Sequence, residues 1–372
     1  MKVLYISPYR TGSDYTDAAV NYILALDAVG VDVVPRCVYN QTVNVPDRIA
    51  ELEKKSSEGC DTLVIHGPPA HFEHYKDFKK CVGITCIETD QFRISTWNNK
   101  LNLMDKIIVA NQQAKKACEE SFVTKPVHVL PYAFDVNKIK SYNPLPEIAN
   151  NNKDFLFYFI ARSNKRKNII DILRAFHSEF RLEESVNLLI KTGAPNLAVE
   201  ITRNDIRKIS DTVKRDLRLY PIDGYKTELV VTEWLTAENL ASLHNTCNCY
   251  IGVGSNENWC APAFDAMAYG KTPIFIPYAG YDEYLDEENG FPTEYNLDNC
   301  FGFVGNSEVY TADEVWARPN IKDLRAAMRY AYNIHTNDKA TLEKMQENGI
   351  DTAYEHSYEN VGTQLKELLL NE

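Results

Sequence analysis

The feature of this sequence that most constrains its fold is a repeated alternation of short apolar runs with helical stretches. In the first half the apolar runs, several of them rich in valine and isoleucine, are 3–6, 31–34, 62–65, 82–87, 106–109 and 127–130. The stretches between them that show helical spacing of apolar residues include 16–29, 47–55 and 112–121. Short β-branched runs that are separated by helices predict a parallel sheet covered on both faces.

The same alternation starts again in the second half of the chain. Its apolar runs are 155–160, 186–192, 229–232, 249–253 and 273–276, and its helical stretches include 168–180, 198–218 and the tail from 321 onward. The segment 141–154 separates the two series; it holds two prolines and four asparagines and little to bury, which is typical of a linker. A chain of 372 residues also exceeds the size at which a single core keeps growing. We therefore predict two α/β domains with doubly wound sheets, residues 1–145 and 153–350.

Composition excludes several classes of protein. The net charge is -12, so the chain as a whole has no attraction for nucleic acid or for an anionic membrane. The nine cysteines are odd in number and contain no Cys-x-x-Cys, which disfavours a disulfide framework or a zinc site and fits a reducing compartment. The apolar run near the N-terminus is too short for a signal peptide, and no window approaches 18 apolar residues. We expect a cytoplasmic protein without a membrane-spanning segment; its oligomeric state cannot be read from the sequence.

The segment 251–277 predicts an anion-binding turn. A strand is followed by a polar loop, a short helix at 263–269 and another strand, with Pro262 suited to the first helical turn and Gly270 to the position after the helix. A helix N-terminus at the carboxyl end of a strand offers free N–H groups and the positive end of the helix dipole. Two acids accompany it: Glu257 lies in the loop and Asp265 in the helix.

A cluster of cations follows the strand predicted at 155–160. It contains Arg162, Lys165, Arg166 and Lys167, at a strand end where a packed core has no use for charge but a diphosphate needs neutralising. A solvated basic turn is the alternative interpretation. Asn168, directly after the cluster, is suited to capping the next helix. The residues alone do not say which of these cations point inward.

The segment ENWCAPAFDAMAYGKTPI resembles the signature of the retaining glycosyltransferases with the GT-B fold, the large family 4 group. Their pattern is Glu, seven residues, Glu, then Ala-Met-Ala-x-Gly and an apolar strand. Glu257 matches the first acid, whereas Asp265 replaces the second Glu and is one methylene shorter. The resemblance implies two Rossmann-like domains that face a central cleft. It also implies that Glu257 contacts the donor sugar near the reacting centre and that Asp265 binds the ribose hydroxyls of the nucleotide.

The resemblance extends to further positions. Family 4 enzymes place an Arg and, five residues later, a Lys on the donor diphosphate, which Arg162 and Lys167 match; the Gly that usually follows is Asn168 here. A C-terminal helix, about 352–372, is implied to pack back on the first domain. The remaining residues that the resemblance places near the donor are Asn258, Trp259, Cys260 and Ala261, through their backbone N–H groups, with Val231 near the base and Gly12 in the first loop.

The first domain offers candidates for the acceptor side. His66 ends the run 62–65, and Glu88 and Asp90 follow the run 82–87. His66 resembles a position that lines the acceptor side of the cleft in several family members, which implies a role in orienting an acceptor hydroxyl or contacting the sugar. The acids, at a strand's carboxyl end, are suited to binding the acceptor. A hydrogen-bonded loop histidine and helix-capping acids are the alternatives. His71 and His74 add two more imidazoles, but no acid accompanies them at helical spacing, so we expect no metal.

Together these features predict a hexosyl- or pentosyltransferase that uses a nucleotide-diphosphate sugar, UDP- or GDP-linked, and retains the anomeric configuration. The candidate catalytic residues are Glu257, Arg162, Lys167 and His66. The chain contains no Asp-x-Asp, so we expect metal-independent transfer and no cofactor. The acceptor is open: a glycan, a small molecule or a modified nucleic acid. The rival functions are a nucleotide-sugar epimerase or sugar phosphorylase on the same fold, and a non-catalytic nucleotide-sugar-binding protein.

Overall fold

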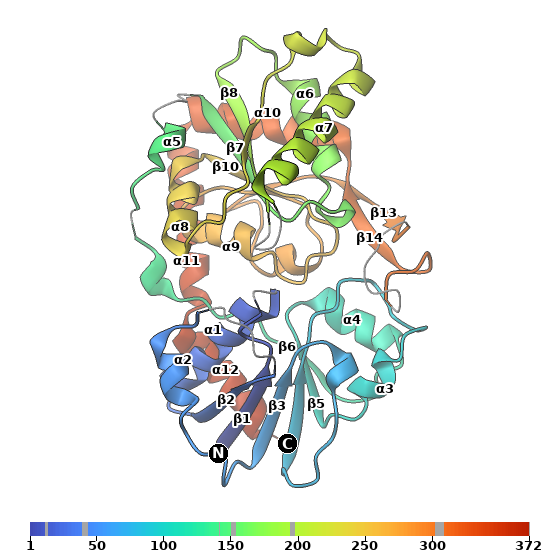
Figure 1. Ribbon diagram of the computed structural model, residues 1–372, viewed down its shortest axis with the longest axis vertical. Coiled ribbons are helices and arrows are strands. Elements are labelled where there is room, and N and C mark those ends of the chain that lie inside the picture. The colour runs from blue at the N-terminus through green and yellow to red at the C-terminus, as the bar shows by residue number, and fades with distance from the viewer. Residues whose placement is uncertain are drawn as a thin grey trace. The chain divides into compact units, whose positions relative to one another are not determined.

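The computed structural model describes residues 1–11, 14–38, 44–140, 142–149, 154–193, 198–301 and 309–371. The chain forms two compact units, and each is described by itself (Figure 1). Unit 1 comprises Met1–Lys138, Asn299–Val315 and Ala353–Glu372, and unit 2 comprises Ile139–Asp298 and Trp316–Thr352. Residues 299–301 and 309–315 group with unit 1, and the predicted domain bounds, 1–145 and 153–350, stay a prediction.

Unit 1 contains a six-stranded, wholly parallel sheet in the order β2-β1-β3-β4-β5-β6. Its strands are β1 (Lys2–Ser7), β2 (Asp32–Cys37), β3 (Thr62–His66), β4 (Lys80–Ile84), β5 (Lys106–Val109) and β6 (Val127–Val129). Each predicted apolar run of the first half falls on one of these strands. The predicted parallel α/β sheet is confirmed.

Helices cover both faces of this sheet. They are α1 (Asp14–Ala28), α2 (Asp47–Leu52), α3 (Trp97–Leu101), α4 (Gln112–Glu120) and the C-terminal α12 (Tyr358–Leu370). Successive residues of β1 point to opposite faces: Val3 and Tyr5 join a core with α1, α2 and α12, while Leu4 packs against the other core with α3 and α4. Helix α12 lies closely beside α1, because a Cβ at Gly362 would be only 2.3 Å from the carbonyl oxygen of Ala25.

Unit 2 contains a second wholly parallel sheet, in the order β12-β11-β10-β7-β8-β9. Its strands are β7 (Phe155–Ile160), β8 (Val186–Lys191), β9 (Leu229–Val231), β10 (Cys249–Gly252), β11 (Ile274–Phe275) and β12 (Phe291–Pro292). The chain starts at β7 in the middle, adds β8 and β9 on one side, then returns to add β10 to β12 on the other. This is the strand order of a doubly wound Rossmann sheet, with the reversal between β7 and β10.

The helices of unit 2 pack around this sheet. They are α5 (Pro146–Ala149), α6 (Ile169–Glu179), α7 (Val199–Leu217), α8 (Ala237–Thr246), α9 (Ala261–Ala268), α10 (Ile321–Asn337) and α11 (Lys339–Glu355), the last of which runs on into unit 1. The described residues also form short 3-10 helices: η1 (Pro69–His71), η2 (Val136–Lys138), η3 (Lys165–Lys167), η4 (Ile222–Gly224) and η5 (Ala279–Glu283). Among the described residues, no helix combines the length and the apolarity needed to cross a membrane.

Two parts of the chain differ from the sequence-based expectation. A two-stranded sheet of β13 (Tyr295–Asn299) and β14 (Val315–Pro319) was not predicted. The segment 141–154 contains the one-turn helix α5, and the backbone N–H of Leu145 beside it donates to Thr246 Oγ1 at 2.8 Å. Residues 141 and 150–153 of this predicted linker lie outside the described part of the chain.

Candidate functional site

A cluster of charged side chains lies where the two central strands of unit 2 end. Strand β7 leads into η3, which carries Arg166 and Lys167, and β10 leads into the loop that carries Glu257. Because the chain reverses its direction across the sheet between β7 and β10, this is the edge where open parallel sheets bind their ligands.

Glu257 is buried between two cations. Its side chain is 6% exposed, and its carboxylate oxygens lie 2.6 and 2.8 Å from Nζ of Lys167, while Oε2 lies 3.4 Å from NH1 of Arg166. Burial opposes ionisation, but the charges of Arg166 and Lys167 outweigh it and lower the pKa of Glu257. The carboxylate is therefore ionised at neutral pH, and the three groups together carry one net positive charge.

The loop that holds Glu257 has an unusual backbone. Asn256 and Cys260 have φ values of 44° and 54°, in the left-handed region that side chains other than glycine rarely adopt. Two glycines make room for the loop: a Cβ at Gly254 would lie 2.1 Å from Oε1 of Glu257, and one at Gly280 would lie 2.5 Å from the carbonyl oxygen of Asn258. The backbone N–H of Gly280 also donates to the carbonyl of Glu257 at 2.9 Å. These contacts fix where the carboxylate stands.

Asn168 joins η3 to the same loop. It precedes α6 as predicted, but its side chain makes no capping hydrogen bond, so the predicted capping role is wrong. Its φ is 53°, and its Nδ2 donates instead to the carbonyl of Val253 at 2.7 Å and to Oγ of Ser255 at 2.9 Å. Asparagine tolerates the left-handed region better than most residues. This explains how Asn168 occupies a position where the family usually has Gly.

The structure shows which cations point inward. Arg166 is 5% exposed, and Lys167 is half-buried against Glu257, whereas Arg162 and Lys165 are exposed. Arg162 follows β7 by two residues and so lies at the same edge of the sheet; its contact with a diphosphate stays a prediction. The sequence analysis named Arg166 only as an alternative, because three consecutive cations give no local sign of which one turns inward.

Helix α9 begins beside this cluster. Pro262 lies in its first turn, and Gly270, with a φ of 70°, follows its end, as predicted. Asp265 is half-buried within the helix. Burial raises the pKa of Tyr158 and of Tyr284, and the charge of Asp265 adds a smaller effect at both. Its predicted contact with ribose stays a prediction.

The remaining donor-site candidates differ in how deeply they are buried. The Trp259 ring is buried against Tyr284 and Phe264, at centroid distances of 4.8 and 5.5 Å, and Tyr284 donates to the carbonyls of Trp259 and Cys260 at 2.8 and 3.1 Å. Burial, with a smaller effect from Glu257, raises the pKa of Cys260 to about 11, so its thiol is protonated. The remaining candidates are Asn258, which is buried, Ala261, which is exposed, and Val231, which is half-buried at the end of β9.

Asn256 is an uncommon feature of this loop. Both polar atoms of its side chain are buried and have no hydrogen-bond partner among the described residues, although the residue is only 2% exposed. Buried amides in native proteins are nearly always hydrogen-bonded. A buried amide of this kind, next to Glu257, suits a site that is completed by a polar ligand.

In unit 1, His66 is the last residue of β3 and lies within an aromatic cluster. It is 1% exposed, its Nδ1 is 2.8 Å from the hydroxyl of Tyr5, and the rings of Tyr15 and Tyr22 each lie 5.7 Å from it. Burial lowers its pKa to about 3, so the imidazole is neutral at physiological pH. These contacts agree with the alternative interpretation, a histidine held by a hydrogen bond within the protein. A role of His66 toward an acceptor stays a prediction. Gly12 lies outside the described residues.

Glu88 and Asp90 hold a distant part of unit 1. The hydroxyl of Tyr310 donates to Glu88 Oε2 at 2.8 Å, and the backbone N–H of Val315 donates to Asp90 Oδ1 at 2.7 Å. Burial raises the pKa of Asp90. These two acids therefore hold Tyr310 and Val315 beside the loop that follows β4, an arrangement that the sequence did not reveal because the partners lie more than 200 positions away. Their role as acceptor ligands stays a prediction.

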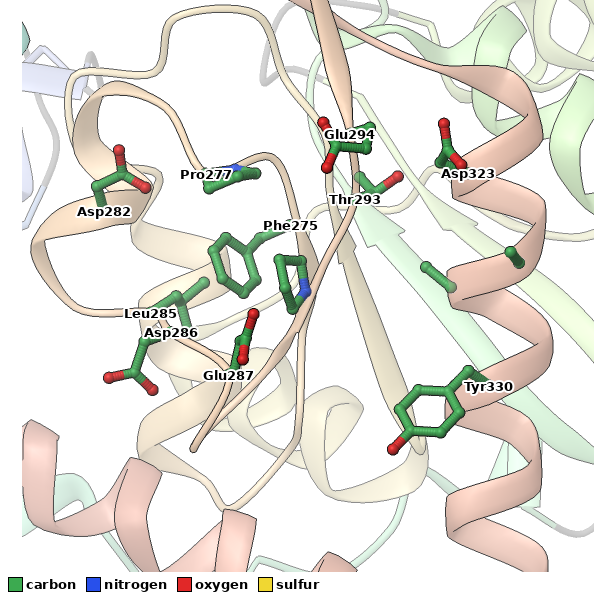
Figure 2. A pocket seen from close by; sticks show the side chains of 13 residues that line it. Phe275, Pro277, Asp282, Leu285, Asp286, Glu287, Thr293, Glu294, Asp323 and Tyr330 are labelled. Atoms are coloured by element: carbon green, nitrogen blue, oxygen red, sulfur yellow. The ribbon is translucent and has the colours of Figure 1, made fainter.

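A cavity of about 620 Å³ in unit 2 does not suit an anionic ligand (Figure 2). The side chains that line it include Phe275, Pro277 and Tyr330, together with five acids and, among the described residues, no Lys or Arg. The acids are Asp282, Asp286, Glu287, Glu294 and Asp323, spread around its rim. Burial, with Glu283 nearby, raises the pKa of Asp282 to about 6. The acids around this cavity repel an anionic ligand.

Comparisons with known proteins show the fold. No family model and no curated protein matches the chain. Among solved structures, sucrose-phosphate synthase from Thermosynechococcus elongatus aligns with a TM-score of 0.62 at 14% identity, covering 99% of this chain and 98% of that one. Trehalose-6-phosphate synthase OtsA aligns at 0.69 with 10% identity, covering 100% and 99%. Anabaena HepE, in complex with UDP-glucose, aligns at 0.66 with 12% identity, covering 99% of each chain.

These alignments extend over both units of the chain. With two parallel six-stranded sheets flanked by helices, this chain has the GT-B fold of glycosyltransferases.

Proposed function

We propose that this protein transfers a sugar from a nucleoside diphosphate sugar to an acceptor hydroxyl, with the donor bound at the carboxyl edge of the unit 2 sheet. The observation that carries the proposal is the buried cluster of Arg166, Lys167 and Glu257 at the point where the strand order reverses. A net positive charge at the ligand-binding edge of a Rossmann sheet suits an anionic nucleotide. The GT-B fold supports the same activity.

The diphosphate is the part of the donor that this cluster fits best. When the glycosidic bond to the nucleotide breaks, negative charge grows on the leaving phosphate, and fixed cations stabilise that charge where it develops. Arg166 and Lys167 supply two such cations, and Arg162 is a third candidate at the same edge. The first turn of α9, with the backbone N–H groups of Asn258 and Ala261 near it, adds the positive end of a helix dipole.

The resemblance assigns the remaining parts of the donor. Glu257 is proposed to contact the sugar, Asp265 the ribose hydroxyls, and the region after Val231 the base. The nearby buried amide of Asn256 adds a donor and an acceptor for a polar ligand. Because HepE is described with UDP-glucose, UDP-sugars are the first donors to test, with GDP-sugars next.

The stereochemistry and the metal independence are also proposals that rest on the resemblance. In retaining transfer of this type, the leaving phosphate itself takes the proton of the acceptor hydroxyl, so no separate base is required. His66 is neutral and held by Tyr5, which suits orienting an acceptor rather than removing its proton. Glu88 and Asp90 are the proposed acceptor ligands of unit 1.

Binding is the first test. Isothermal titration calorimetry with UDP, UDP-glucose, GDP and GDP-mannose is compared between the wild type, Lys167→Ala and the matched control Lys208→Ala, whose side chain is 78% exposed. Loss of a charged hydrogen bond to phosphate weakens binding by roughly 10- to 100-fold. We expect this loss in Lys167→Ala and none in Lys208→Ala. If no nucleoside diphosphate or nucleotide sugar binds the wild type, the proposal is wrong.

Turnover is the second test. Release of nucleoside diphosphate from the donor that binds, measured without added Mg²⁺ or Mn²⁺, should be lost in Glu257→Ala. Proton NMR of the glycoside product should show the donor's anomeric configuration. An epimerised sugar formed without any acceptor would indicate an epimerase, and free phosphate consumed or released would indicate a phosphorylase. A wild type that binds the donor and never turns it over would indicate a non-catalytic binding protein.

A further inference from the structure

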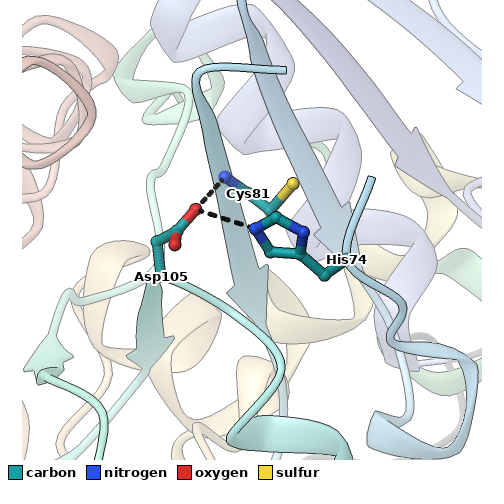
Figure 3. Close-up of side chains that lie close together, drawn as sticks. All are labelled: His74, Cys81 and Asp105. Carbon is teal, nitrogen blue, oxygen red and sulfur yellow. Dashed lines mark hydrogen bonds and ion pairs between the residues drawn. The ribbon is translucent and has the colours of Figure 1, made fainter. Parts of the chain in front are cut away.

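Three side chains of metal-ligating types meet at the edge of the unit 1 sheet that lies opposite the strand ends described above. They are His74, from the connection between β3 and β4, Cys81, the second residue of β4, and Asp105, directly before β5 (Figure 3). One ligand atom from each lies within 4.8 Å of the other two, and Nε2 of His74 is 3.7 Å from Oδ2 of Asp105. In the part of the chain that the structure describes, this is the one group of three or more such residues with this spacing.

The backbone holds two of the three ligands in place. The N–H of Cys81 donates to Oδ2 of Asp105 at 2.8 Å, and the N–H of Asp105 donates to the carbonyl of Cys81 at 2.9 Å. The pairing of β4 with β5, in which Val82 lies opposite Lys106, fixes this reciprocal contact. A carboxylate oriented by a hydrogen bond from the backbone is the arrangement that supports metal ligands in proteins.

The segment that carries His74 is anchored on both sides. Phe72 is fully buried against β4, where a Cβ at Gly83 would lie 2.3 Å from Cε2 of the Phe72 ring. A turn follows, in which the N–H of Phe78 donates to the carbonyl of Tyr75 at 3.2 Å. These contacts on both sides hold the backbone at His74, and so keep its exposed imidazole next to Cys81 and Asp105.

The ligand set identifies the class of metal. An imidazole nitrogen, a thiolate sulfur and a carboxylate oxygen are the ligands of Zn²⁺, whereas Mg²⁺ and Ca²⁺ prefer oxygen alone. Tetrahedral zinc with bonds of about 2.0–2.3 Å places its ligand atoms about 3.3–3.8 Å apart. For a nitrogen and an oxygen ligand the separation is about 3.3–3.5 Å, so the 3.7 Å between His74 and Asp105 must shorten by only a few tenths of an ångström when the ion binds. Their side chains are 38% and 40% exposed, so an ion and a water ligand can reach them from solvent, while Cys81 is buried behind them.

We propose that His74, Cys81 and Asp105 bind one Zn²⁺, with water as the fourth ligand, and that the ion fastens the segment 72–78 to β4 and β5. On binding, the Cys81 thiol, which donates to the carbonyl of Tyr75 at 3.6 Å, releases its proton to solvent, and the sulfur forms its bond to zinc as thiolate. The site lies at the amino-terminal ends of the strands, away from His66 and Glu88, so the proposal does not depend on the proposed transferase activity.

The local sequence around His71 and His74 has no acid at helical spacing, and for that reason no metal was expected there. The acid instead comes from the start of β5, and the thiol from β4, so neighbouring strands supply what the local sequence lacks. Only the register of the sheet brings them to the imidazole.

Titration with Co²⁺ as a spectroscopic stand-in for zinc tests the proposal. The full-length protein is treated with chelator, cleared of it, and titrated with Co²⁺ while its near-ultraviolet and visible spectra are recorded. We expect one equivalent to bind with a thiolate-to-cobalt charge-transfer band, and Zn²⁺ to displace it. Cys81→Ser should lose the band, and His74→Ala should bind at least about tenfold more weakly. The matched controls Cys60→Ser and His71→Ala should titrate like the wild type.

Circular dichroism checks that each variant is folded. Should Cys81→Ser fail to fold, His74→Ala keeps the test decisive, because its side chain is exposed and its removal leaves the core intact. A wild type that binds no stoichiometric Co²⁺, a charge-transfer band that survives in a folded Cys81→Ser, or a His74→Ala variant that binds as tightly as the wild type would each overturn the proposal. Calorimetry with nucleotide sugars gives a separate readout, so failure here leaves the donor-binding proposal standing.

Discussion

Replacing Glu257 with Gln tests whether its carboxylate stabilises unit 2 by compensating the charges of Arg166 and Lys167. The substitution keeps the size of the side chain and one acceptor oxygen but removes its charge. Arg166 and Lys167 then face each other across a buried amide instead of a carboxylate. Two cations that have lost their shared anion destabilise the folded state, so we expect Glu257→Gln to unfold at a lower temperature than the wild type.

The size of the effect follows from distances and burial. At an effective dielectric constant of about 20, unit charges at the observed separations of 2.6 and 3.4 Å attract by about 6 and 5 kcal/mol. The cost of burying the charges offsets much of this, and removing one partner of a buried ion pair typically costs about 3–5 kcal/mol. Lys167 keeps the amide oxygen as a partner and is 18% exposed, so we expect the lower end, about 3 kcal/mol. For a unit of this size that is a fall of roughly 6–12 °C in the melting temperature.

Differential scanning calorimetry at pH 7 measures the fall, with Glu347→Gln as the control because Glu347 is exposed on α11. Since the cluster lowers the pKa of Glu257, its contribution is present above the ordinary carboxyl pKa and is lost as the pH falls below it. The difference in melting temperature between the wild type and Glu257→Gln should therefore become smaller in acid. A Glu257→Gln variant that melts within 2 °C of the wild type at pH 7 would refute the reasoning.

Three further predictions concern unit 2. Burial opposes the charge of Glu228, but His177 and Lys214 lower its pKa from 4.5 to about 2, so it stabilises the fold by about 3 kcal/mol at neutral pH. That stability should disappear as the pH falls from about 4.5 toward 2. In urea unfolding, the free energy of unfolding of Glu228→Gln should therefore fall less over this pH range than that of the wild type. Asn168→Ala should be less stable than Asn168→Gly by about 1 kcal/mol in the same assay, because its φ is 53°. Gly254→Ala should displace Glu257 and weaken donor binding in calorimetry, whereas an unchanged affinity would show that the loop adapts.

The sheets could be predicted from the sequence because their strands are buried on both faces. In strand β5 all four residues are buried and three of them are apolar and β-branched, and its predicted bounds match the structure. Strand β13 could not be found in this way, because three of its five residues are Asn or Asp and four of the five are exposed. The two-stranded sheet that it forms with β14 has no apolar alternation to signal it.

The candidate site could be predicted only as far as local sequence determines geometry. The motif around Glu257 located the acid loop and α9, because Pro262 and Gly270 mark the helix ends through backbone preferences of their own. Which cation meets Glu257 depends on the turn of η3, with about three residues per turn, and on the left-handed Asn168 after it. Neither is visible in a run of consecutive cations, which is why Arg166 was not the first choice.

The geometry of Lys167 lets it keep its ion pair with Glu257 and still offer a hydrogen bond to the proposed diphosphate. An ammonium group has three donors, and Lys167 directs two hydrogen bonds to Glu257, at 2.6 and 2.8 Å. Within the described contacts its third donor is left for a ligand oxygen, so a diphosphate can bind without first breaking the buried ion pair. Glu257 then holds Lys167 in position while its charge keeps the free protein from carrying two unpaired cations. A site built in this way favours anionic ligands over neutral ones, because only an anion balances the one positive charge that remains.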